Sequence, residues 1–181
     1  EPLLRYLEKL KADNPEEEPI VWAISSVYQK LKQPNKAIGV LQNGINNHPA
    51  WMQSYIRLAF LYKQTGNNGK AVETYTDALL RQPNNNQIRL LLASTFEVDK
   101  NFLAAKKFYE IVLEKDRGND AATNNLANLL LDRFSTVENI IKALKLSERF
   151  VNSSQPFFKD TYAWALLKSG DENGALSVIN Q

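Results

Sequence analysis

The chain has 181 residues, 44% of them hydrophobic and 23% charged, with seven glycines, seven prolines and no cysteine. This composition excludes disordered, collagen-like and disulfide-stapled classes and cysteine-based zinc fingers. With 22 basic and 20 acidic residues the net charge is +2, which is too small to indicate a nucleic-acid or anionic-membrane partner. Apolar runs are too short for a membrane span, and no signal peptide opens the chain.

The sequence predicts helices throughout, arranged in units of similar length. Leu3, Leu7 and Leu10 have helical spacing, and we expect them to form the second helix of a half repeat at 1–17. Each following unit contains two amphipathic helices of about 12–14 residues, because apolar residues recur at spacings of three and four. We expect one repeat domain, 1–181, with three regular units at 18–51, 52–85 and 86–119, an irregular unit at 120–155 and a truncated one at 156–181.

A 34-residue period underlies these units, as the positions of Pro15, Pro49 and Pro83 illustrate. Small residues keep the same step in two columns, one on the first helix and one on the second helix of each unit. Because small side chains let two helix backbones approach closely, the columns predict the contact within each pair. The columns are Ser25, Ala59, Ala93 and Ala127, and Ala37, Ala71 and Ala105.

One such unit is too small to bury the apolar surface that offsets its loss of conformational entropy. Neighbouring units must therefore stack, and the sequence predicts an all-α solenoid of antiparallel helix pairs. One unit carries a combination that resembles the tetratricopeptide repeat, and the resemblance covers nearly the whole chain. It implies a right-handed superhelix that acts as a protein-binding scaffold. The residues that carry it are Leu58, Ala59, Tyr62, Gly66, Ala71, Tyr75, Ala78 and Pro83.

Two segments, 124–130 and 160–166, are further similar to bacterial tetratricopeptide proteins linked to exopolysaccharide export and protein sorting. This similarity implies a bacterial protein. It favours a periplasmic or outer-membrane-associated location over a cytoplasmic one, although the compartment itself stays open. The first residue is Glu1 and neither end has the polar cap of a complete solenoid, so we expect the 181 residues to be part of a longer array.

The fourth unit departs from the period. Ala127 precedes Ala143, its expected partner on the second helix, by 16 residues, whereas Ser25 precedes Ala37 by 12. We expect the four extra residues to lie within 132–139 as a lengthened turn between the two helices, with Phe134 packed against the stack. The alternative is a local bend or a docking loop.

Residues suited to catalysis are few. His48 is the only histidine, and before Pro49 we expect it to face solvent in a turn. The acidic run 16–18 precedes a helix that starts near Pro19, where carboxylates complement the helix dipole; metal binding is the alternative. Zinc-protease, serine-hydrolase and phosphate-loop motifs are absent from the sequence. We therefore expect no enzymatic activity, no cofactor and no metal.

The resemblance places the first helices along an inner surface, and residues between the packing columns face it. Apolar side chains gathered there are expected to anchor a ligand, and asparagine amides can bond its backbone. The alternative is that Trp22 and Phe60 pack on the neighbouring repeat. The expected peptide-binding groove consists of Trp22, Ile56, Phe60, Lys63, Leu90, Asn124, Asn125, Asn128 and Trp164.

Members of this family that bind chaperone tails grip a terminal carboxylate with basic and amide side chains. Here the matching positions hold Trp22, Ser26 and Leu91, so we expect no charged clamp. The expected ligand is an amphipathic helix or extended segment with apolar anchors.

The leading hypothesis is a non-catalytic scaffold that binds a protein or peptide partner. The alternative is a structural spacer or self-association module of a longer bacterial envelope protein, which would form a homodimer. A third interpretation is a targeting domain attached to an enzyme. We expect neither nucleic acid nor a membrane span among its interactions.

Overall fold

The computed structural model describes residues 2–180, and every regular element in that range is a helix. The chain divides into two compact units, Glu1–Thr95 and Phe96–Gln181. The division falls inside α6 (Asn86–Val98), so the last three residues of that helix belong to the second unit. Each unit is described by itself.

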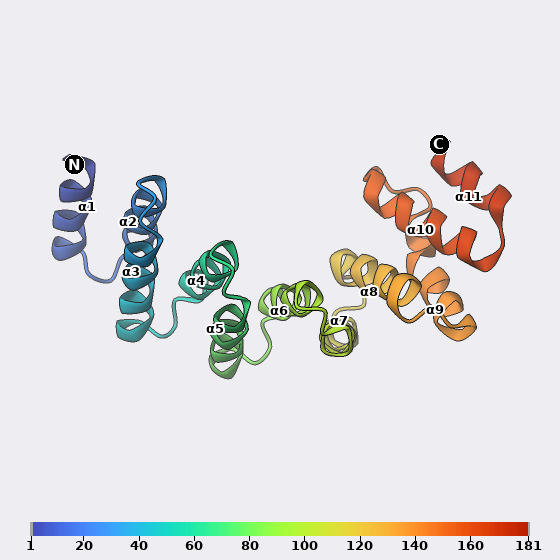
Figure 1. Ribbon diagram of the computed structural model, residues 1–181, viewed down its shortest axis with the longest axis horizontal. Helices are drawn as coiled ribbons and strands as arrows, with labels where there is room; N and C mark the ends of the chain where they lie inside the picture. Colours follow the sequence, from blue (N-terminus) through green and yellow to red (C-terminus); the bar gives the residue numbers. More distant parts are fainter. Residues whose placement is uncertain (1, 181) are drawn as a thin grey trace. The chain divides into compact units, whose positions relative to one another are not determined.

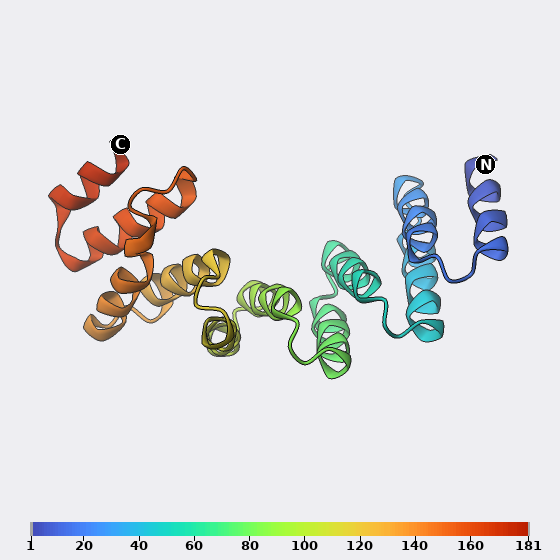
Figure 2. The same cartoon turned by 180° about the vertical axis from the view of Figure 1, so that it is seen from behind.

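The first unit consists of antiparallel helix pairs (Figure 1). Helix α2 pairs with α3 and α4 pairs with α5, while α1 packs on α2 and α3 packs on α4. The view from behind shows the same two hairpins (Figure 2). The helices are α1 (Pro2–Asp13), α2 (Glu18–Lys30), α3 (Pro34–Asn47), α4 (Met52–Gln64), α5 (Asn68–Arg81) and the greater part of α6.

The second unit repeats this pairing. Helix α8 pairs with α9 and α10 pairs with α11, while α7 packs on α8, and α10 also contacts α8 and α9. A short 3-10 helix, η1, follows α9 directly and also packs on α10. The elements are α7 (Phe102–Lys115), α8 (Asp120–Arg133), α9 (Val137–Ser147), η1 (Glu148–Phe150), α10 (Pro156–Ser169) and α11 (Glu172–Ile179).

The two predicted columns of small residues are buried, as expected for the contacts within the helix pairs. In the first pair the hydroxyl of Ser25 donates to the carbonyl of Ala37 at 3.4 Å, so the two columns touch. A larger side chain at either position would push the two helices apart. The residues that are at most 2% exposed are Ser25, Ala37, Ala59, Ala71, Ala93, Ala105, Ala127 and Ala143.

Four of the connections between successive helices are turns of one type. A residue with positive φ follows the first helix, and the next amide donates to a carbonyl five residues earlier, as in a Schellman motif. In the α4–α5 turn Gly66 has φ 75° and the amide of Asn67 donates to the carbonyl of Tyr62 at 2.8 Å. Residues with positive φ at the equivalent places are Lys32, Lys100 and Gly170.

The α8–α9 pair is the exception, and the predicted lengthened turn is wrong. This turn spans 134–136, three residues, the same length as 31–33 between α2 and α3. Phe134 has φ −126° instead of a positive value, and the α9 N-terminus is capped by the side chain of Thr136. The irregularity is therefore a change of turn type.

The displaced small residue is explained by the register of α9. Ala143 is the seventh residue of its helix, whereas Ala37, Ala71 and Ala105 are each the fourth residue of theirs. At about 1.5 Å per residue, the buried small side chain lies roughly 4.5 Å further along α9. Of the four additional residues between the columns, three therefore lie in α9 and one at the end of α8.

Two buried tyrosines make stability sensitive to alkali. Burial raises the pKa of Tyr75 to about 12 and raises the pKa of Tyr109 as well. Because the unfolded chain loses these protons from pH 10 upward and the folded chain retains them, stability is complete below pH 10 and declines toward pH 12. In urea unfolding at pH 8 to 12, the free energy of unfolding should fall above pH 10 by about 1.4 kcal/mol per pH unit for each tyrosine.

The Tyr75→Phe variant isolates the contribution of this side chain. Its free energy of unfolding should fall less steeply with pH than that of the wild type. If the free energy of unfolding falls equally steeply with pH in the two proteins, Tyr75 does not contribute to the sensitivity to alkali.

Candidate functional site

Trp22, the first predicted groove residue, joins two neighbouring repeats. Its indole N–H donates to the hydroxyl of Ser54 on α4 at 3.1 Å, and the Arg57 guanidinium lies 4.6 Å from the centroid of its ring. The side chain is half-buried. This is the alternative considered from the sequence: Trp22 packs on the next repeat, which gives it a structural role.

The acidic run lies at the N-terminus of α2 and also contacts α4. Glu17, at the N-terminus of α2, makes no side-chain cap bond. Glu18 instead accepts hydrogen bonds from the backbone N–H and the hydroxyl of Ser54, both at 2.8 Å. The carboxylate accepts from an amide in the first turn of α4 and complements the dipole of that helix. Glu18 also lies in the first turn of α2, where the sequence predicts that a carboxylate complements the helix dipole.

His48 is also placed differently from the prediction. Its ring stacks on Trp51, with 4.1 Å between centroids, and Nδ1 lies 3.2 Å from the Glu16 carboxylate. The side chain is 21% exposed. The expected solvent-facing turn residue is thus part of the contact between repeats, because the large indole at the start of α4 covers it.

Phe60, in contrast, is largely exposed. Its exposed fraction is 55%, although it belongs to a helix with seven buried residues. Ile56 and Lys63 lie four residues before and three after it, hence on the same face of α4, and both are partly exposed. Leu90 holds the position of Ile56 on α6 and is also partly exposed. We refer to Ile56, Phe60, Lys63 and Leu90 as the Phe60 face.

The three predicted asparagines in the second unit make hydrogen bonds within the protein. Asn124 accepts a bond from the Thr161 hydroxyl at 2.7 Å, and Asn128 donates to the same hydroxyl at 3.0 Å. Asn125 donates to the hydroxyl of Tyr109 at 3.3 Å. These bonds join α8 to α10 and α7, so the amides predicted to bind a ligand have a structural role in this unit.

Trp164 also spans two repeats. Its indole N–H donates to Asp132 at the end of α8 at 3.1 Å, and the Lys168 ammonium lies 4.6 Å from its ring centroid. At 37% exposure it keeps a free ring surface. It belongs to the second unit, whereas the Phe60 face belongs to the first.

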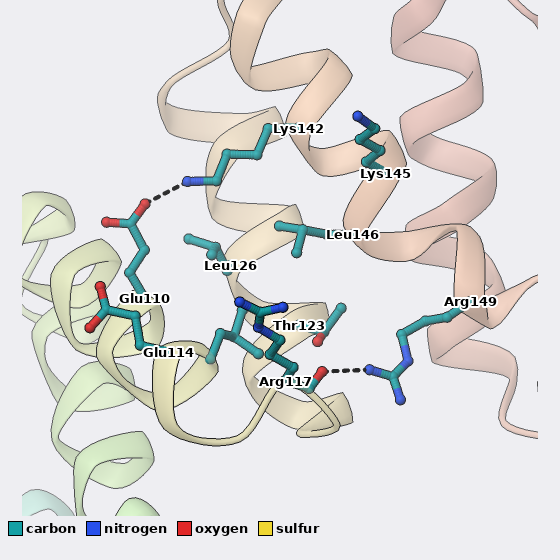
Figure 3. Close-up of a pocket in the computed structure, with 10 residues that line it drawn as sticks. Glu110, Glu114, Arg117, Thr123, Leu126, Lys142, Lys145, Leu146 and Arg149 are labelled. Atoms are coloured by element: carbon teal, nitrogen blue, oxygen red, sulfur yellow. Dashed lines mark hydrogen bonds and ion pairs between the residues drawn. The ribbon is translucent and has the colours of Figure 1, made fainter.

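A cavity that sequence reasoning missed lies between α7, α8 and α9, with a volume of about 690 Å³. In Figure 3 the leucines Leu126 and Leu146 lie at its centre, Lys142 and Lys145 on α9 above them, and Arg117 and Arg149 below. We call this cavity the charged trough. It is lined by Glu110, Leu113, Glu114, Arg117, Thr123, Leu126, Lys142, Lys145, Leu146 and Arg149.

Ion pairs hold part of the trough in place. The Lys142 ammonium lies 2.7 Å from the Glu110 carboxylate, and Lys106 lies 3.4 Å from the same oxygen. Burial raises the pKa of Glu110, but the hydrogen bonds and charges of the two lysines outweigh it, so the pKa lies below its ordinary value. Arg149 contacts Asp120 at 3.0 Å and donates to the Arg117 carbonyl at 2.9 Å.

The first unit has an equivalent cavity between α3, α4 and α5, with a volume of about 520 Å³. Two 34-residue periods separate the matching positions. Threonine in place of tyrosine removes bulk from the trough, and glutamate replaces a neutral amide twice. The equivalent pairs are Gln42 and Glu110, Asn46 and Glu114, Tyr55 and Thr123, and Leu58 and Leu126.

Within residues 2–180 no three acidic or histidine side chains gather as a metal site. No helix of the described chain is long and apolar enough to cross a membrane.

The sequence model of one family matches the chain over residues 53–85, which comprise nearly all of α4, the whole of α5 and the turns that follow them. The family is the tetratricopeptide repeat. Residues 53–85 are a tetratricopeptide repeat. They coincide with the expected second regular unit, and they contain the residues on which the resemblance was based. No curated protein matches the chain.

Solved structures match nearly the whole chain, and two of the three described below are of tetratricopeptide repeat proteins. A tetratricopeptide repeat protein from Parabacteroides merdae is 14% identical, with a TM-score of 0.70 over 98% of this chain and 70% of its own. MamA from Desulfovibrio magneticus is 13% identical, with a TM-score of 0.71 over 90% of both chains. YrrB, described as having an unusual peptide-binding site, is 11% identical, with a TM-score of 0.68 over 96% and 89%.

These matches confirm the predicted all-α fold of tetratricopeptide helix pairs. At such low identity they establish the fold alone. The names of the three proteins lend no support to a link with exopolysaccharide export.

Proposed function

We propose that this tetratricopeptide chain is a non-catalytic protein-interaction scaffold, which binds an apolar segment of a partner protein on the Phe60 face. The observation that carries the proposal is the exposure of Phe60, at 55%, between Ile56 and Lys63 on one helix face. An exposed aromatic side chain beside other apolar groups is the usual anchor of a protein interface. The tetratricopeptide fold and the peptide-binding site described for YrrB agree with this role.

The proposal narrows the predicted groove. Trp22 and the three asparagines support the helix pairs, and the ligand would contact the Phe60 face. An aliphatic or aromatic side chain of the ligand would cover Phe60, while Lys63 would contact a polar edge of the same segment. Because side chains of the scaffold provide the binding, no catalytic group or cofactor is required.

A photo-crosslinking amino acid at position 60 tests the proposal in cells of the source organism, with position 80 as the control. Leu80 is 75% exposed on α5 and lies outside the Phe60 face. We expect position 60, and not position 80, to crosslink to one protein that mass spectrometry identifies. Crosslinking to a second copy of the chain would favour the self-association alternative, and no crosslink would contradict both.

The affinity of the purified partner then measures the role of the side chain. Phe60→Ala should weaken binding at least tenfold, about 1.4 kcal/mol, because the anchor is lost. Its midpoint of urea unfolding should stay unchanged, since an exposed side chain contributes little to stability. Leu80→Ala should leave both unchanged. Unaltered binding of Phe60→Ala would rule out the Phe60 face.

A further inference from the structure

We propose that the charged trough of the second unit is a separate binding site, which takes an acidic amphipathic segment of a partner protein. The trough is lined by four cations and two carboxylates around a floor of three leucines. Apolar surface surrounded by an excess of positive charge fits a ligand with carboxylates beside an aliphatic side chain. The site does not depend on the Phe60 face.

Two of the four cations are available to a ligand. Lys142 is held by Glu110, and Arg149 is held by Asp120. Arg117 and Lys145 form no ion pair with any residue in the described range 2–180, and both are exposed. A carboxylate can therefore pair with either of them without displacing an internal partner.

The arrangement favours an elongated ligand over a small anion. Lys142, Lys145, Leu146 and Arg149 lie at spacings of three, four and seven residues, so they follow one face of α9 and η1 over about 10 Å. The positive charges are thus distributed along the trough. A helix with carboxylates every three or four residues and a leucine between them matches both the charges and the apolar floor.

The charge of the trough is not a general property of this fold. The equivalent cavity of the first unit is lined by one cation, Lys70, and two carboxylates, Glu73 and Asp77. The cavity of the first unit thus carries an excess of negative charge, whereas the charged trough carries an excess of positive charge. The substitution of Thr123 for the equivalent Tyr55 also leaves the trough larger.

A phage-displayed library of random peptides provides the test. Peptides are selected on the intact chain after depletion on the double variant Arg117→Glu, Lys145→Glu. We expect binders rich in Asp and Glu with at least one Leu or Ile. Synthetic versions should bind the wild type at least tenfold more tightly than the double variant, and their affinity should fall as salt is added.

Controls separate the site from net charge and from the Phe60 face. The double variant Lys107→Glu, Lys115→Glu reverses two exposed charges on α7 outside the trough, and should bind as the wild type does. Phe60→Ala should also bind the peptides with unchanged affinity, whereas Leu146→Gln should bind them more weakly. Circular dichroism of each variant confirms that it is folded.

Several results would overturn the proposal. These are the recovery of no binders after depletion, the absence of acidic enrichment among them, or an equal loss of affinity in the control variant. Binding of a single-stranded oligonucleotide that depends on Arg117 and Lys145, without any peptide binding, would assign the trough to a different class of ligand.

Discussion

Replacing Tyr109 by alanine is expected to lower the free energy of unfolding by about 3–5 kcal/mol. The ring is fully buried, so its removal leaves a cavity. Its hydroxyl donates to the Glu97 carboxylate and accepts from the Asn125 amide, and both groups would lose this partner. Urea unfolding followed by circular dichroism measures the change.

A matched pair of conservative variants separates packing from hydrogen bonding. Tyr109→Phe keeps the ring and should cost about 1–2 kcal/mol, because the hydrogen bond to a carboxylate is lost. Tyr75 holds the same position one repeat earlier and is also buried, but burial alone raises its pKa, whereas the hydrogen bond to Glu97 adds to the effect of burial at Tyr109. Tyr75→Phe should therefore change stability by less than about 0.5 kcal/mol. Equal costs for the two variants would show that the hydrogen bond between Tyr109 and Glu97 adds nothing to stability.

Trp22→Ala is expected to destabilise the first unit by about 2–3 kcal/mol, less than for a fully buried aromatic side chain. The indole packs between α2 and α4, donates to Ser54 and lies beside the Arg57 guanidinium. Removing it weakens the contact between two repeats, on which the stability of such a fold depends. The midpoint of urea unfolding should fall, and the unfolding transition should broaden as the repeats lose their coupling.

The comparison with Phe60→Ala decides between the two roles considered for Trp22. Replacing a binding residue should lower the affinity for a partner and leave unfolding unchanged, as expected for Phe60→Ala. Replacing a structural residue should lower the free energy of unfolding. If Trp22→Ala unfolds at the same urea concentration as the wild type, the role assigned to its contact with α4 is wrong.

The regular part of the fold could be predicted because it depends on periodic apolar and small residues. Ser25, Ala59 and Ala93 repeat at the same step, and each is buried in the expected place. The α8–α9 turn could not be predicted this way. Counting residues between Ala127 and Ala143 reveals an irregularity, but the count is the same for a longer turn and for a shifted helix. Only the dihedral angles and the helix bounds distinguish them.

The candidate sites were less predictable for a different reason. The sequence identified Phe60 as a surface residue. Asn124 and Asn128 hold equivalent positions in their repeat, but both form hydrogen bonds with the Thr161 hydroxyl. Hydrogen bonding between repeats depends on side-chain geometry that periodicity does not contain. The charged trough could not be predicted, because its lining residues, from Glu110 to Arg149, come from α7, α8, α9, η1 and a turn. Each of its charged residues, taken alone, resembles an ordinary solvated charge.

The register of α9 has a consequence for engineering this chain. Consensus design transfers the residue of one repeat to the same place in the next, and it is a dependable way to stabilise repeat proteins. Position 143 corresponds by count to Tyr75 and Tyr109, so a consensus sequence would place a tyrosine there. Ala143 is fully buried, and a ring at that position would overpack the junction. Repeats in this protein must therefore be aligned by their buried contacts, because counting residues aligns α9 with the wrong side chains.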